Sequence, residues 1–204
     1  MSTPIIRNVI FDVGKVLYQW DLRHLFVQLI DDPAELDWFL ANVVTQEWHF
    51  EHDAGRPLAE MVPERIAQFP DYATHIEAYA ARFNDTIPGP VPGSLELVEG
   101  LAANAIPLFG ITNFGAEFWA EFRPTAPIFD HFIDIIVSGE ERISKPDPAI
   151  YRLALQRFGV TAESCIFIDD RAENVAGAKS VGMNGHVFKD APTLERELAA
   201  LELL

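Results

Sequence analysis

The chain has 204 residues, of which 49% are hydrophobic, so it is long enough for one domain of usual size and a smaller insertion. Fifteen Lys and Arg residues against 31 Asp and Glu residues give a formal net charge of −16, which argues against nucleic acid and anionic membranes as partners. The single cysteine, Cys165, has no partner for an internal disulfide, and no run of about 18 apolar residues occurs. The first residues do not resemble a secretory leader, so we expect a cytoplasmic protein.

The predicted elements begin with a short apolar strand at residues 9–11, which runs directly into Asp12. From residue 21 to residue 86 the pattern is helical, without a strand, and Asp32 followed by Pro33 is typical of a helix start. We expect helices over residues 22–30, 34–44, 58–69 and 73–84. The proline-rich and glycine-rich stretch 88–93 ends this helical part.

Beyond residue 93, helical and apolar strand-like segments alternate along the chain. The expected helices are 94–103, 116–122, 149–158, 172–181 and 193–203, and the expected strands are 107–111, 133–137, 166–168 and 185–188. Such alternation indicates βαβ units and a parallel sheet. We therefore predict an α/β fold: a three-layer doubly wound parallel sheet formed by residues 1–17 and 91–204, with a helical bundle inserted at residues 18–90.

Four short polar motifs each follow an apolar run, at residues 11–16, 111–113, 144–146 and 168–170. Loops at the carboxyl ends of parallel strands line one crevice, so these motifs converge if their strands are neighbours. Their order is Asp12, then Thr112 and Asn113, then Lys145, then Asp169 and Asp170 with Asn174 four residues on. This order resembles the haloacid dehalogenase superfamily of aspartate-nucleophile hydrolases, many of which carry a helical cap just after the nucleophile.

The resemblance implies a role for each motif. Asp12 would be the nucleophile that forms an aspartyl-phosphate, while the Thr112 hydroxyl, the Asn113 main-chain N–H and the Lys145 ammonium hold the phosphoryl oxygens. One Asp12 oxygen, the Gly14 carbonyl and Asp170 would bind Mg²⁺, an oxygen-only set that suits this ion.

Two residues near the metal motif keep open roles. Asp169 would be an outer hydrogen-bond acceptor or a further metal ligand. Asn174 stands where many relatives have a third acid, and it would hold a metal-bound water or face solvent.

The sequence departs from the superfamily pattern at Gly14, where most phosphatases of the superfamily have a second aspartate that protonates the leaving group and then activates water. Loss of a positioned acid or base costs roughly 10² to 10⁴ in rate, which leaves catalysis possible for substrates with good leaving groups, such as sugar 1-phosphates or aryl phosphates. Lys15 and His24 are nearby candidates for a replacement role. One phosphatase branch of the superfamily also has Asp-x-Gly in this motif.

Two rival functions remain open at this point. Metal-independent 2-haloacid dehalogenases use the same nucleophile without the second aspartate, but they hold the substrate with an early-cap arginine that Arg23 matches poorly. A binding or regulatory protein that kept the fold and lost turnover is the other alternative. The carboxylate pair Asp169–Asp170 favours a metal, which a dehalogenase does not need.

The sequence thus predicts a Mg²⁺-dependent phosphatase of a small phosphorylated metabolite, with sugar phosphates as one class, and it does not predict the oligomeric state. A polar turn at residues 53–56, next to His49 and His52, is a candidate for selecting the substrate, chiefly through Arg56. The aromatic side chains of the helical part, such as Trp48 and Phe50, are expected to pack mostly in its core.

Overall fold

A computed structural model describes residues 6–204; residues 1–5, which the prediction assigns to the sheet-forming part, lie outside the described residues. The chain forms a five-stranded sheet in the order β3-β2-β1-β4-β5, and every neighbouring pair is parallel. The strands are β1 (Asn8–Phe11), β2 (Leu108–Thr112), β3 (Phe132–Val137), β4 (Cys165–Asp169) and β5 (Asn184–Val187). The predicted α/β fold is confirmed, and its first strand lies at the centre of the sheet.

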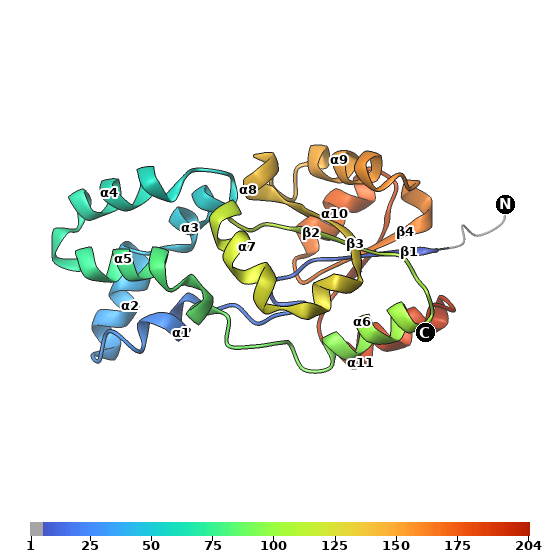
Figure 1. Cartoon of the computed structure of the whole chain (residues 1–204), viewed down its shortest axis with the longest axis horizontal. Helices are drawn as coiled ribbons and strands as arrows, with labels where there is room; N and C mark the ends of the chain where they lie inside the picture. Colours follow the sequence, from blue (N-terminus) through green and yellow to red (C-terminus); the bar gives the residue numbers. More distant parts are fainter. Residues whose placement is uncertain (1–5) are drawn as a thin grey trace.

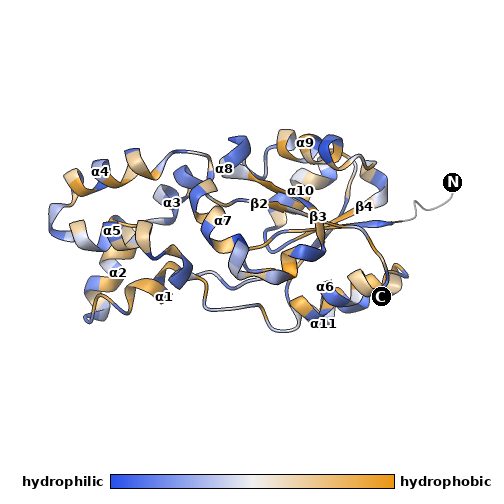
Figure 2. Ribbon diagram, viewed as in Figure 1, coloured by the Kyte–Doolittle hydropathy of each residue, from blue (hydrophilic) through white to orange (hydrophobic). Residues whose placement is uncertain are grey.

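Both faces of the sheet are buried, as the continuous apolar strands require. Successive side chains of a strand point to opposite faces, so Val9 and Phe11 pack in one core cluster and Ile10 packs in another. Helices α6 (Ser94–Ala103) and α11 (Ala191–Ala200) cover the first face, and α9 (Pro148–Phe158) and α10 (Ala172–Ser180) cover the second (Figure 1). Figure 2 shows hydrophobic strands between outer helices that carry both hydrophobic and hydrophilic residues.

Residues between β1 and α6 form a helical group beside the sheet (Figure 1). Its members are α1 (Leu22–Phe26), α2 (Pro33–Asn42), α3 (Gln46–Asp53), α4 (Leu58–Gln68) and α5 (Ala73–Ala81), with 3₁₀ turns at Pro70–Tyr72 and Phe83–Thr86. Aromatic pairs fill its interior, for example Phe26 with Phe39 at 4.6 Å between ring centroids. The boundaries at 17/18 and 90/91 stay a prediction.

Helix bounds in this group differ from the sequence prediction: α5 ends at Ala81 instead of residue 84, and two larger differences concern α1 and α3. Helix α1 ends at Phe26 instead of residue 30, and tight turns follow, in which the Gln28 N–H donates to the Leu25 carbonyl. Helix α3 was not predicted, although Thr45 caps it by accepting a hydrogen bond from the Trp48 N–H at 3.1 Å.

The remaining short elements connect the strands: α7 (Ala116–Phe122), α8 (Ser138–Glu141) and 3₁₀ turns at Arg123–Thr125, Pro127–His131 and Ala162–Ser164. Helix α8 follows β3 directly and separates it from Lys145. Within residues 6–204, no helix combines the length and apolar character needed to cross a membrane.

Candidate active site

Three carboxylates meet where the two central strands end. Strand β1 leads into Asp12, and its neighbour β4 ends at Asp169, which Asp170 follows. One carboxylate oxygen from each of the three lies within 4.8 Å of the others. Asp12 and Asp169 are buried and Asp170 is half-buried, so their mutual repulsion is poorly screened by water.

Lys145 is the cation inside this cluster. Its Nζ lies 2.7 Å from Asp12 Oδ1 and 2.7 Å from Asp169 Oδ2, and its side chain is buried. Asn113, just after β2, fixes the Lys145 backbone: the Lys145 N–H donates to Asn113 Oδ1 at 2.8 Å, and Asn113 Nδ2 donates to the Lys145 carbonyl at 3.0 Å. Burial disfavours the ammonium, but Asp12 and Asp169 outweigh it and raise the pKa of Lys145.

The two carboxylates that share Lys145 differ in their protonation. Burial raises the pKa of Asp12 to about 8 although Lys145 opposes the rise, and Asp169 and Asp170 add to it. The pKa of Asp169 is lowered: burial alone would raise it, but Lys145 and the hydrogen bonds from Arg171 and Asn174 prevail. Asp169 is therefore the ionised partner of Lys145, and Asp12 needs a further cation to ionise fully at neutral pH.

Asp169 has no acceptor capacity to spare. Its Oδ1 accepts from the Arg171 N–H at 2.8 Å and from Asn174 Nδ2 at 3.0 Å, and its Oδ2 accepts from Lys145 Nζ and again from Asn174. The prediction left two roles open for Asp169. This geometry favours the role of an outer hydrogen-bond acceptor, which orients Lys145, and it argues against Asp169 as a metal ligand. Asn174 is buried, so it does not face solvent, and its side-chain amide donates hydrogen bonds to Asp169.

Three residues of this cluster keep oxygens free to bind a cation. Within the described residues, no side chain and no backbone N–H of another element donates a hydrogen bond to these oxygens. They are Asp12 Oδ2, the Asp170 side-chain oxygens and the Gly14 carbonyl. Burial, and next Asp169, raise the pKa of Asp170, so an added positive charge would relieve both acids. An all-oxygen donor set of this kind fits Mg²⁺.

Thr112 ends β2 beside this cluster. Its hydroxyl is buried and has no hydrogen-bond partner among residues 6–204, which is unusual for a buried donor. The backbone beyond it is fixed, because the Phe114 N–H donates to Ser138 Oγ at 3.0 Å.

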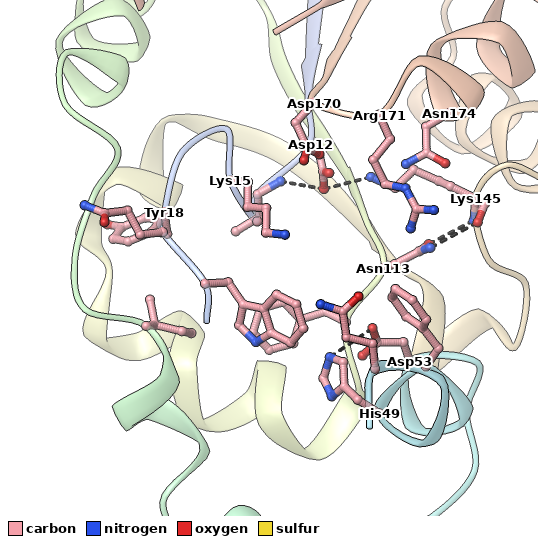
Figure 3. Close-up of a pocket in the computed structure, with 18 of the residues that line it drawn as sticks. Asp12, Lys15, Tyr18, His49, Asp53, Asn113, Lys145, Asp170, Arg171 and Asn174 are labelled. Atoms are coloured by element: carbon pink, nitrogen blue, oxygen red, sulfur yellow. Dashed lines mark hydrogen bonds and ion pairs between the residues drawn. The ribbon is translucent and has the colours of Figure 1, made fainter. Parts of the chain in front are cut away.

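A cavity of about 450 Å³ opens next to Asp12, between the sheet and the helical group (Figure 3). Its polar end is formed by Asp12, Gly14, Asn113, Lys145, Asp170 and Asn174. Aromatic and apolar side chains form much of the remainder: Tyr18, Trp20, Phe50, Phe83, Ile87, Phe114 and Phe122. Figure 3 shows His49 and Asp53, on the helical group, across the cavity from Asp12 and Asp170.

The structure separates the residues that the sequence grouped for substrate selection. Asp53 and His49 line the cavity, whereas Arg56 does not. The prediction for Arg56 finds no support in this geometry, because its guanidinium pairs with Glu51 at 2.5 Å and with Glu64, both at the surface.

The structure also distinguishes the two candidates for replacing the missing aspartate, because Lys15 lines the cavity and His24 does not. His24 borders a neighbouring depression of about 390 Å³, which Lys15 also borders. Lys15 lines the cavity, and its charge counteracts the raised pKa of Asp170.

The fold and the cluster agree with a scan against known families, in which the model for haloacid dehalogenase-like hydrolases matches residues 6–182. The chain belongs to the haloacid dehalogenase-like hydrolases. Among curated members, a sesquiterpene phosphatase from Aspergillus oryzae is 26% identical over 197 residues, covering 96% of each chain.

Solved structures of the family share the fold at low sequence identity. A family enzyme from Bacteroides thetaiotaomicron, crystallised with magnesium and inorganic phosphate, superposes with a TM-score of 0.66 at 19% identity over 91% of this chain and 95% of its own. An L-2-haloacid dehalogenase from Xanthobacter autotrophicus with chloropropionic acid covalently bound gives 0.62 at 18% identity, over 96% and 83%. At these identities the two neighbours show a shared fold, and the choice between phosphate and haloacid chemistry depends on the site.

Proposed function

We propose that this hydrolase cleaves small phosphomonoesters with Mg²⁺ as cofactor and Asp12 as nucleophile. The observation that carries the proposal is the cluster of Asp12, Asp169 and Asp170, in which Lys145 compensates only part of the negative charge. A further cation explains why three acids gather there, and a metal-independent dehalogenase would have no use for it.

The chemistry follows from the position of each group. An Asp12 oxygen attacks phosphorus, the bond from phosphorus to the leaving oxygen breaks, and a water then attacks the aspartyl-phosphate at phosphorus to release phosphate and regenerate Asp12. The unpartnered Thr112 hydroxyl and the Asn113 N–H would donate to the phosphoryl oxygens, and Lys145 would neutralise their charge. Mg²⁺, held by Asp12, the Gly14 carbonyl and Asp170, would supply positive charge that keeps Asp12 ionised and balances the phosphate.

Gly14 bears on the range of substrates. Because it has no side chain to give the leaving oxygen a proton, esters of acidic alcohols should react fastest, which keeps sugar 1-phosphates and aryl phosphates as candidates. Lys15 lines the cavity and is the stronger of the two replacement candidates.

The comparisons support a phosphatase acting on a small molecule. Curated relatives include a sesquiterpene phosphatase and a phosphoserine phosphatase from Thermus thermophilus, and a structural neighbour binds magnesium and phosphate. A cavity of about 450 Å³ beneath a helical group suits a metabolite better than a polymer. We keep the cap at residues 18–90 and a cytoplasmic location as parts of this proposal.

Hydrolysis of p-nitrophenyl phosphate, with Mg²⁺ and with EDTA, tests the proposal beside chloride release from chloropropionate. Asp12→Asn is the inactive comparison, and Asp71→Asn, at an exposed aspartate outside the cavity, is the matched control. We expect Mg²⁺-dependent phosphate release that only Asp12→Asn abolishes. Metal-independent chloride release would make the protein a dehalogenase, and no turnover in either assay would favour the binding-protein alternative.

A further inference from the structure

A column of four stacked rings extends from the sheet-forming part to the cavity. Phe118 of α7 stacks on Phe83 at 3.8 Å between ring centroids with 5° between planes. Phe83 stacks on His49 of α3 at 5.6 Å and 14°, and His49 stacks on Trp20 at 4.8 Å and 24°. Trp20 is therefore the last ring of the column, and it lines the cavity.

Polar contacts at both nitrogen atoms of His49 fix the orientation of its ring within the column. Tyr79 Oη lies 2.7 Å from His49 Nδ1, and Asp53 Oδ2 lies 3.3 Å from Nε2. Burial, and next Asp53, raise the pKa of Tyr79 well above its ordinary value, so Tyr79 keeps its proton and donates it to Nδ1. Tyr79 and Asp53 thus contact the His49 ring at its two nitrogen atoms.

Among residues 6–204, His49 is the aromatic side chain that stacks on Trp20, and the other face of Trp20 has no aromatic partner. Because His49 covers one face, the Lys15 ammonium, 5.5 Å from the ring centroid, lies at the opposite one. Lys15 is exposed and long, and its removal from Trp20 requires no change in the packed core. A flat group could take its place on Trp20.

Phe50 forms a second aromatic wall of the cavity, and a cation lies over its ring as Lys15 lies over Trp20. Phe50 of α3 lines the cavity, is 37% exposed, and has the Arg171 guanidinium 5.7 Å from its ring centroid. Lys15 and Arg171 belong to the loops that follow β1 and β4, which also supply Asp12 and Asp170. Trp20 and Phe50 thus each face a cation from a loop that also carries a carboxylate of the cluster.

We propose that the leaving group of the natural substrate contains a flat apolar ring that stacks on Trp20, with Phe50 as a second wall. This substrate class rests on the proposed phosphatase function. Gln46 and Glu47 border the same cavity, so the ring can carry a polar substituent at its edge. A sugar presents less apolar area to this wall than an aromatic ring of similar size does.

Two phosphates of primary alcohols separate ring recognition from leaving-group chemistry: naphthylmethyl phosphate and glucose 6-phosphate. We expect the wild type to prefer the naphthyl ester in kcat/KM by at least about tenfold, since aromatic stacking and ring burial together reach that range. Trp20→Ala should remove most of the preference by raising KM for the naphthyl ester alone. Trp20→Phe, which keeps a flat face, should retain most of it.

Trp38→Ala is the matched control, because Trp38 is 46% exposed on α2 and lies outside the cavity. It should leave both esters unaffected. Equal kcat/KM for the two esters, or a parallel loss for both in Trp20→Ala with normal circular dichroism, would overturn the inference.

Binding of naphthylmethylphosphonate and of methylphosphonate, which cannot be hydrolysed, distinguishes failure of this inference from failure of the phosphatase proposal. Tighter binding of the naphthyl compound that depends on Trp20, without hydrolysis of any ester, would contradict the phosphatase function alone. Hydrolysis of both esters without a Trp20-dependent difference would contradict the ring-binding inference alone.

Discussion

Lowering the pH from about 8 to about 6 should weaken Mg²⁺ binding about 50-fold, because the metal ion and a proton compete for Asp12. The pKa of Asp12 in the metal-free protein is about 8, chiefly because of burial. Half of the molecules then carry an ionised Asp12 at about pH 8, and about one in a hundred does at pH 6. The apparent affinity falls in that proportion.

Isothermal titration calorimetry with Mg²⁺ measures both the dissociation constant and the number of protons released on binding. The dissociation constant should change with pH as stated, and titrations in buffers of different ionisation heat should show release of nearly one proton per metal ion near pH 6. Asp12→Asn should bind more weakly at about pH 8 but should lose this proton release. An affinity that stays constant over this interval, or a proton release that persists in Asp12→Asn, would refute the reasoning.

Three further predictions concern the same cluster. Lys145→Met should reduce kcat/KM for p-nitrophenyl phosphate by about 10² or more, because Asp12 and the phosphate lose their shared cation; a loss below about tenfold in a folded variant would contradict this role. Gly14→Asp should fold normally, since a Cβ there meets no atom within 4 Å. It should raise kcat/KM for alkyl phosphates more than for p-nitrophenyl phosphate, by up to about 10². An equal change for both esters would argue against a missing acid. Asp12→Asn should raise the Tm of the metal-free protein by an amount that grows from about pH 4 to about pH 8 and then levels off, because the raised folded pKa of Asp12 costs stability as pH rises from its ordinary value of 3.8 to about 8. A Tm difference that shrinks over this interval in scanning calorimetry would contradict this sign.

The sheet and the cluster of carboxylates could be predicted because short sequence patterns determine them. An apolar run that ends in Asp12 or Asp169 already indicates a buried strand with a polar end, and parallel pairing then brings such ends together. The order of the motifs supplied Lys145, which lies beyond a short helix and which strand patterns alone would not have placed in the cluster. Its two ion pairs at 2.7 Å depend on the fold of three separate loops.

The cavity wall could not be predicted in the same way, because it depends on tertiary packing. The ring column joins residues 20, 49, 83 and 118, which share no local spacing. Helix α3, missed from the sequence although Thr45 is a good N-cap, decides which side chains face the site. It turns His49 and Asp53 inward, while the acids Glu51 and Glu64 hold Arg56 at the surface.

The central claim is that Asp12 becomes phosphorylated, and the chain allows a direct measurement. Acid quenching during turnover of p-nitrophenyl phosphate, followed by borohydride reduction, converts an aspartyl-phosphate into homoserine. Cleavage after Arg7 and Lys15 then releases residues 8–15, in which Asp12 is the single acidic residue. We expect homoserine at position 12 only when Mg²⁺ and substrate are both present, and the slow water attack caused by Gly14 should favour accumulation of the intermediate. Turnover that leaves this peptide unmodified at every quench time, or that places homoserine at another residue, would contradict the account.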